Sequence, residues 1–203
     1  MRIRRIAALT AAIALPLGAV GTIAAAEFAS AKALPDTGTI TCATPTHVTA
    51  TLSTPYTGTG TPGVKKTTTS LTSSTFAGCS RTGTGTATGG SSAAAVIKQK
   101  VAAGQNASDC SKILSAGVGG FKLKITWNDG TKSSITLTGG SAVTSPVIGF
   151  LETGTVTAGS FVGKSVHVLA ALDGPTTTAM VGCIGGSPTP VPSLGLNTTI
   201  TVN

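Results

Sequence analysis

The stretch "GFKLKITW", residues 120–127, constrains the fold more than any other part of this sequence. Apolar and polar side chains alternate through it, so one face is buried and the other faces water, as in a strand of an antiparallel sheet. The turn sequence "NDG" follows at 128–130, and the apolar residues of "TKSSITLTG", 131–139, return in the same phase. We therefore predict a β-hairpin over residues 120–139, in which Trp127, the single tryptophan, is the core anchor.

The rest of the chain repeats this pattern more faintly. Alternation recurs at 47–53, 164–172 and 195–203, and turn-rich joints such as "PYTGTGTPG" separate the segments. The chain holds 37 Thr and 27 Gly but only 3 % aromatic residues, a composition that favours strands over helices. The sequence predicts an all-β fold, a single antiparallel β-sandwich of the Ig-like or jelly-roll-like kind, with a β-barrel as the alternative. The stretch 92–104 is compatible with either a strand or a short helix.

The first thirty residues have the layout of a secretory signal peptide. Arginines at positions 2, 4 and 5 precede an apolar run over 6–26, and small residues follow. Cleavage after Ala31 fits the small residues at 29 and 31, and cleavage after Ala26 is the alternative. We expect residues 1–31 to be the signal peptide and residues 32–203 to be one exported domain with no stable membrane span. The pentapeptide "LPDTG" at 34–38 spells a sortase signal, but its place near the N-terminus indicates a coincidence.

Four cysteines follow the leader, Cys42, Cys79, Cys110 and Cys183. An even number in an exported chain predicts two disulfides. Sequence leaves three pairings open. We favour Cys42 with Cys183 and Cys79 with Cys110, because "TITC" and "MVGC" both resemble strands near the two ends of the chain.

The charge pattern bears on possible partners. The formal net charge is +8, part of which belongs to the leader. The lysines are scattered, and Arg81 is the single arginine after the leader, so the arginine forks and stacking aromatics of nucleic-acid binding proteins are not expected here. We predict no nucleic-acid partner, no cofactor and no metal, and name anionic cell-envelope components or glycans as the candidate partners.

The residues that carry acid–base chemistry are few. Hydrolases need a nucleophile with a base, or paired carboxylates. His47 and His167 fall on the outward phase of their strands, and Asp129 and Asp173 each precede a glycine, as in turns. Asp36 falls in what we interpret as the flexible start of the mature chain, Asp109 lies near a loop, and Glu152 is the one carboxylate without an evident structural role. We therefore predict that the protein is not an enzyme.

Short motifs along the chain resemble those of uncharacterised exported β-rich proteins of high-GC Gram-positive bacteria. They are "GTITC" at 38–42, "GCS" at 78–80, "CSKIL" at 110–114, "KITW" at 124–127, "GTVTAGSFVGKSV" at 154–166, and Cys183 before a final strand. The resemblance implies a secreted β-rich fold and supplies no catalytic residue.

Together these features predict a secreted or envelope-associated, non-enzymatic β-sandwich protein with a structural role or a role in binding a ligand or surface through its loops. The alternatives are an exported hydrolase and an envelope pore-forming barrel. A polar cleft that gathers His47 or His167 with a carboxylate would favour the hydrolase.

Overall fold

The computed structural model describes residues 36–100, 106–111, 118–145 and 147–203. The fold below is that of the compact unit Ala33–Asn203. The predicted signal peptide, residues 1–31, lies outside the described residues.

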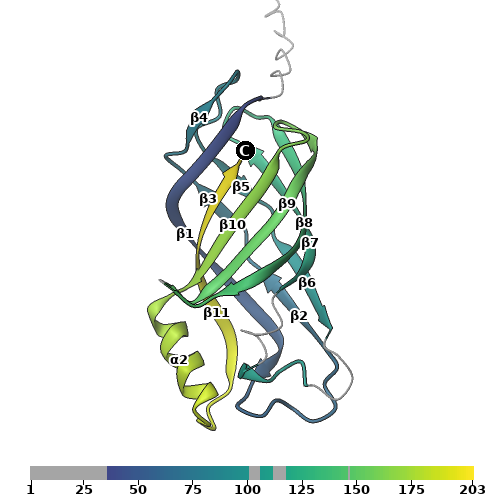
Figure 1. The fold of residues 1–203 in the computed structure, drawn as a ribbon, viewed down its shortest axis with the longest axis vertical. Helices are drawn as coiled ribbons and strands as arrows, with labels where there is room; N and C mark the ends of the chain where they lie inside the picture. Colours follow the sequence, from purple (N-terminus) through teal and green to yellow (C-terminus); the bar gives the residue numbers. More distant parts are fainter. Residues whose placement is uncertain (1–35, 101–105, 112–117, 146) are drawn as a thin grey trace, which may run out of the picture. The chain divides into compact units, whose positions relative to one another are not determined.

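The described residues form one large antiparallel sheet (Figure 1). Its strands follow in the order β3-β5-β7-β8-β9-β10-β11-β1-β2-β6, and β4 pairs separately with the start of β1. The strands are β1 (Thr39–Tyr56), β2 (Lys66–Leu71), β3 (Ser74–Phe76), β4 (Ser80–Thr82), β5 (Gly90–Ser92), β6 (Ala95–Lys100), β7 (Val118–Trp127), β8 (Lys132–Val143), β9 (Gly149–Gly159), β10 (Ser165–Leu172) and β11 (Val191–Val202).

The sheet is curled, so that the edge strand β6 lies beside β7 (Figure 1). A Cβ placed on Gly119 of β7 would lie only 3.3 Å from the carbonyl oxygen of Lys98 in β6. The predicted all-β, antiparallel class is confirmed. The strands form one curved layer, an arrangement closer to the barrel alternative than to two packed sheets.

Alternation places the core on the inner face of this curve. Phe121 to Trp127 pair with β8 across the turn at 128–130, which confirms the predicted hairpin. Trp127 is 2 % exposed, as expected of a core anchor, and its ring meets that of Phe161 edge-on at 5.3 Å. The core has two clusters, one around Trp127 and Phe161 and the other around Tyr56 and Met180.

Helix α2 (Gly174–Ile184) corrects the expectation that "MVGC" is a strand. Asp173 caps it, because its carboxylate accepts a hydrogen bond from the backbone N–H of Thr176, and Pro175 occupies the first turn. The sequence "DGP" at 173–175 is typical of a turn, but an aspartate at the N-cap followed by a proline in the first turn also begins a helix. Among the described residues, no helix is long and apolar enough to cross a membrane.

The two predicted disulfides are present, but the favoured pairing is wrong. Cys42 is bonded to Cys79, and Cys110 to Cys183. The short strand β4 explains the first bond, since its pairing of Ser80 with Thr41 places Cys79 next to Cys42. The second joins the end of α2 to the loop at 106–111, which hydrogen-bonds to Thr57.

Asp36 is buried, which corrects its interpretation as part of a flexible start. Its carboxylate lies 3.0 Å from the guanidinium of Arg81 and accepts a hydrogen bond of 3.0 Å from the hydroxyl of Thr131. Its backbone N–H donates to the hydroxyl of Ser160, and its carbonyl accepts from the N–H of Phe161. Residue 36 is therefore fastened to strand β4, to the connection between β7 and β8 and to the turn between β9 and β10.

Candidate ligand-binding pocket

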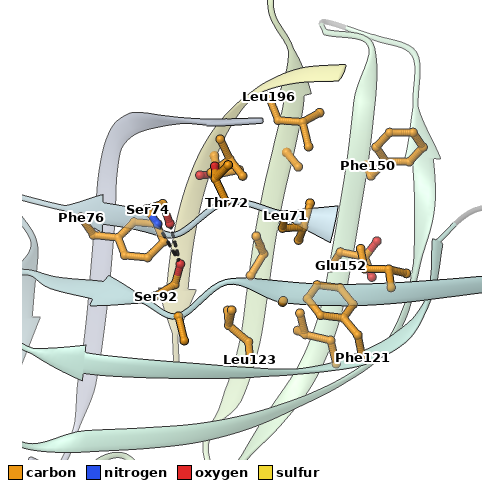
Figure 2. Close-up of a pocket in the computed structure, with 18 residues that line it drawn as sticks. Leu71, Thr72, Ser74, Phe76, Ser92, Phe121, Leu123, Phe150, Glu152 and Leu196 are labelled. Carbon is orange, nitrogen blue, oxygen red and sulfur yellow. Dashed lines mark hydrogen bonds between the residues drawn. The ribbon is translucent and has the colours of Figure 1, made fainter. Parts of the chain in front are cut away.

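The inner face of the curled sheet contains an apolar pocket (Figure 2). Its cavity volume is about 80 Å³, within a wider hollow of about 670 Å³ that includes open solvent. Phe76 and Leu123 of the wall belong to the first core cluster, and Phe150 and Leu196 to the second. The pocket therefore lies where the two clusters meet.

Small residues leave this space open. Three alanines, Ala93, Ala95 and Ala170, line the pocket at positions where larger side chains would fill it. Gly140 of β8 leaves room for the carboxyl of Glu152, its partner across the ladder, because a Cβ there would lie 2.4 Å from a carboxylate oxygen of Glu152. The cavity is thus a consequence of side-chain size along several strands.

Four hydroxyl groups in the wall are already engaged. The hydroxyls of Ser74 and Ser92 are hydrogen-bonded to each other at 2.7 Å. The hydroxyl of Thr72 accepts from the backbone N–H of Thr49, and that of Thr198 donates to the carbonyl of Thr46. These groups fasten neighbouring strands to one another.

Glu152 differs from these hydroxyls. It is 4 % exposed and follows Phe150 on the inward phase of β9 (Figure 2). Neither carboxylate oxygen has a hydrogen-bond partner among the described residues. Burial raises the pKa of Glu152 from its ordinary value of 4.5 to about 7, since a charged carboxylate is poorly solvated in apolar surroundings.

Replacing Glu152 with glutamine should change how stability depends on pH. Between pH 4.5 and 7 the unfolded chain loses its Glu152 proton while the folded chain keeps it, so folding stability falls as pH rises through this window. Glu152→Gln removes this loss, which is on the order of 3 kcal/mol. Denaturant unfolding at pH 4.5 and pH 8 measures it: the variant should gain stability over the wild type only at the higher pH. Parallel pH profiles for the two proteins would contradict the prediction.

The histidines and aspartates that the sequence analysis considered for acid–base chemistry do not line this pocket. Both histidines are exposed, as expected from their strand phase. Asp129 accepts from Thr131 in the hairpin turn, and Asp109 accepts from Ser111 in its loop. These two carboxylates stabilise turns.

His47 does meet a carboxylate, at 3.2 Å from Asp173. The His47 side chain is 56 % exposed, and neither residue lines the pocket. The Asp173 carboxylate also caps α2, and hydrogen bonds from Thr176 lower its pKa below the ordinary value. We therefore interpret the pair as part of the helix cap, outside any cleft of the kind expected for a hydrolase.

The described residues contain no group of three or more His, Cys, Asp or Glu side chains able to hold a metal ion. The sequence interpretation missed the pocket itself. Only one signal pointed towards it: in "GFLETGTV", residues 149–156, Glu152 shares the inward phase with Phe150 and Val156.

Comparison with known proteins finds no match to this chain among protein-family models, curated proteins or solved structures.

Proposed function

We propose that this protein is an exported, non-enzymatic binding protein that takes a small, mainly apolar molecule into the pocket of its curled sheet. The observation that carries the proposal is the apolar cavity at the meeting point of the two core clusters. Ligand sites are typically concave, apolar and provided with a few polar groups, and this wall combines aromatic and aliphatic side chains with one buried carboxyl. Binding inside the sheet replaces our earlier expectation of binding through surface loops.

Two features support release outside the cell or retention on its envelope. Two disulfides suit an oxidising compartment, and the N-terminal sequence has the layout of a signal peptide. Exposed lysines on the outer face of the sheet, such as Lys122 and Lys124, would attract an anionic envelope surface. In this proposal the envelope is where the protein resides, and the pocket holds its ligand.

The polarity of the two faces of the sheet supports binding over the alternative of an envelope pore. Inward positions of β9 include Phe150 and Val156, while Thr153, Thr155 and Thr157 are exposed on its outer face. A lipid-embedded pore needs the reverse, an apolar outside around a polar lumen.

Titration calorimetry with benzene, a neutral apolar probe small enough for such a cavity, tests the proposal. We expect saturable binding with one site per chain. Ala170→Phe, which places a ring in the cavity, should weaken binding by about tenfold or more, since the ring occupies the space in which the probe would bury its apolar surface. The matched control is Ala158→Phe, at an exposed position of β9, which should leave the affinity within about twofold. Equal weakening by both substitutions, or by neither, would contradict the assignment of the site.

A further inference from the structure

The pocket wall contains one polar group with unmet hydrogen-bonding capacity. The four hydroxyls of the wall each have a partner within the fold, as described above. The carboxyl of Glu152 has none among the described residues, on either oxygen. A buried polar group without a partner destabilises a fold by about 1–3 kcal/mol, and more when it is charged, so such groups in native structures call for an explanation.

The surroundings of Glu152 show what could satisfy it. Its carboxyl lies beside Gly140, and Leu71, Phe121 and Phe150 are on the same wall (Figure 2). Apolar side chains offer no donors, and both oxygens of a carboxylate accept hydrogen bonds. An occupant of the pocket that carries hydrogen-bond donors would satisfy both oxygens.

Among the residues that the structure describes, no other ionisable side chain lines the pocket. Among the charged or titratable residues of the surrounding strands whose side chains are described, besides Glu152, Tyr56 of β1 is buried, and burial raises the pKa of Tyr56 to about 12, so it stays neutral between pH 6 and pH 8. The others are exposed: His47, Lys66, Lys98, Lys122, Lys124, Lys132 and His167. They lie on the outer face, where salt screens their repulsion of a cation over about 8 Å. A positive charge inside the pocket would consequently interact chiefly with Glu152.

We propose that the pocket selects ligands carrying a primary ammonium group on a short apolar body, and that the ammonium donates to the carboxylate of Glu152. This inference rests on the proposed function and adds the chemical class of the ligand. An ammonium supplies three donors and a charge, enough for both oxygens, whereas a hydroxyl supplies one donor and a carboxylate ligand supplies none. The apolar body would occupy the cavity between the two core clusters.

Three probes with the same chain and different head groups test the inference. Titration calorimetry at pH 8 compares n-hexylamine, 1-hexanol and hexanoate on the purified, disulfide-intact protein. We expect hexylamine to bind about tenfold or more tightly than hexanol, because hydrogen bonds to charged groups are the stronger ones, and hexanoate to bind least. In Glu152→Gln the ratio of the hexanol Kd to the hexylamine Kd should fall below about threefold.

The pH dependence in the wild type supplies a second readout that needs no variant. Hexylamine remains protonated from pH 6 to pH 8, while Glu152, with its pKa of about 7, gains a proton as the pH falls. The affinity for hexylamine should therefore weaken about tenfold from pH 8 to pH 6, and that for hexanol should stay nearly constant. If Glu152→Gln does not fold, this profile alone decides the matter.

The outcomes separate the two proposals. Hexylamine binding no tighter than hexanol at pH 8, a preference that persists in Glu152→Gln, or an affinity for hexylamine that does not change with pH would overturn the ammonium inference. In each of these cases saturable binding of benzene would leave the apolar pocket intact as a binding site. Failure of that probe and of all three hexyl compounds would overturn both proposals.

Discussion

Replacing Arg81 with methionine is expected to lower the free energy of unfolding by about 3 kcal/mol or more. The substitution leaves the carboxylate of Asp36 buried without its cation, and that side chain is 0 % exposed. Removing one partner of a buried ion pair is far more damaging than removing both, because the remaining charge has neither water nor a counter-ion. Arg81 also donates to the backbone carbonyls of Thr37, just before β1, and Thr84, just after β4, so both segments lose a hydrogen bond as well.

Denaturant unfolding of four proteins measures this effect. The double variant Asp36→Asn with Arg81→Met removes both charges and should recover at least half of the loss. The matched control Lys122→Met removes an exposed cation from β7 and should change stability by no more than about 0.5 kcal/mol. A loss in Arg81→Met no larger than in the control would show that the ion pair contributes little.

Removing the disulfide between Cys110 and Cys183 should have an equally large effect. The bond closes a span of 73 residues, and the loop-entropy model gives about 4 kcal/mol for such a span. Both cysteines are 0 % exposed, so replacing them with alanine also removes well-packed sulfur atoms from the second core cluster. We expect the double variant Cys110→Ala with Cys183→Ala to unfold at a much lower denaturant concentration than the wild type.

The other disulfide is the matched comparison. Cys42 and Cys79 span 37 residues, for which the same model gives a stabilisation smaller by about 0.6 kcal/mol. Peptide mapping without reduction checks the connectivity directly and should yield one fragment holding Cys42 with Cys79 and another holding Cys110 with Cys183. Recovery of fragments that join Cys42 to Cys183 would contradict the structure.

Local alternation predicted the strands well. The hairpin predicted at 120–139 corresponds to β7, β8 and the turn between them, the strand at 164–172 to β10, and the final strand at 195–203 to the end of β11. These predictions succeeded because an alternation with a period of two can be read from consecutive residues. The ambiguous stretch 92–104 contains strand β6 over Ala95–Lys100. The burial of Trp127 was predicted in the same way, because Trp127 lies on the same face of its strand as Leu123 and Ile125.

Contacts between residues far apart in the sequence could not be predicted from local alternation. The pairing of Cys42 with Cys79 depends on the three residues of β4 lying against β1. The sequence "SRT" at 80–82 is too short to show an alternating pattern that would predict this strand pairing. Asp36 was placed at a flexible end because its partners, Arg81 and Thr131, are 45 and 95 residues away. The cavity depends on alanines and glycines from separate strands, which become neighbours only when the sheet curls.

The pairing of β1 with β11 has a consequence for the biogenesis of the protein. The first strand of the sheet hydrogen-bonds to the last, with Ile40 opposite Val202, so the ladder joins residues from the two extremes of the folded unit. The sheet cannot be completed without β11, because β1 and β10 both pair with it. Pairings between residues so far apart in sequence form more slowly than local hairpins, so the closing of this ladder is expected to be a late step of folding.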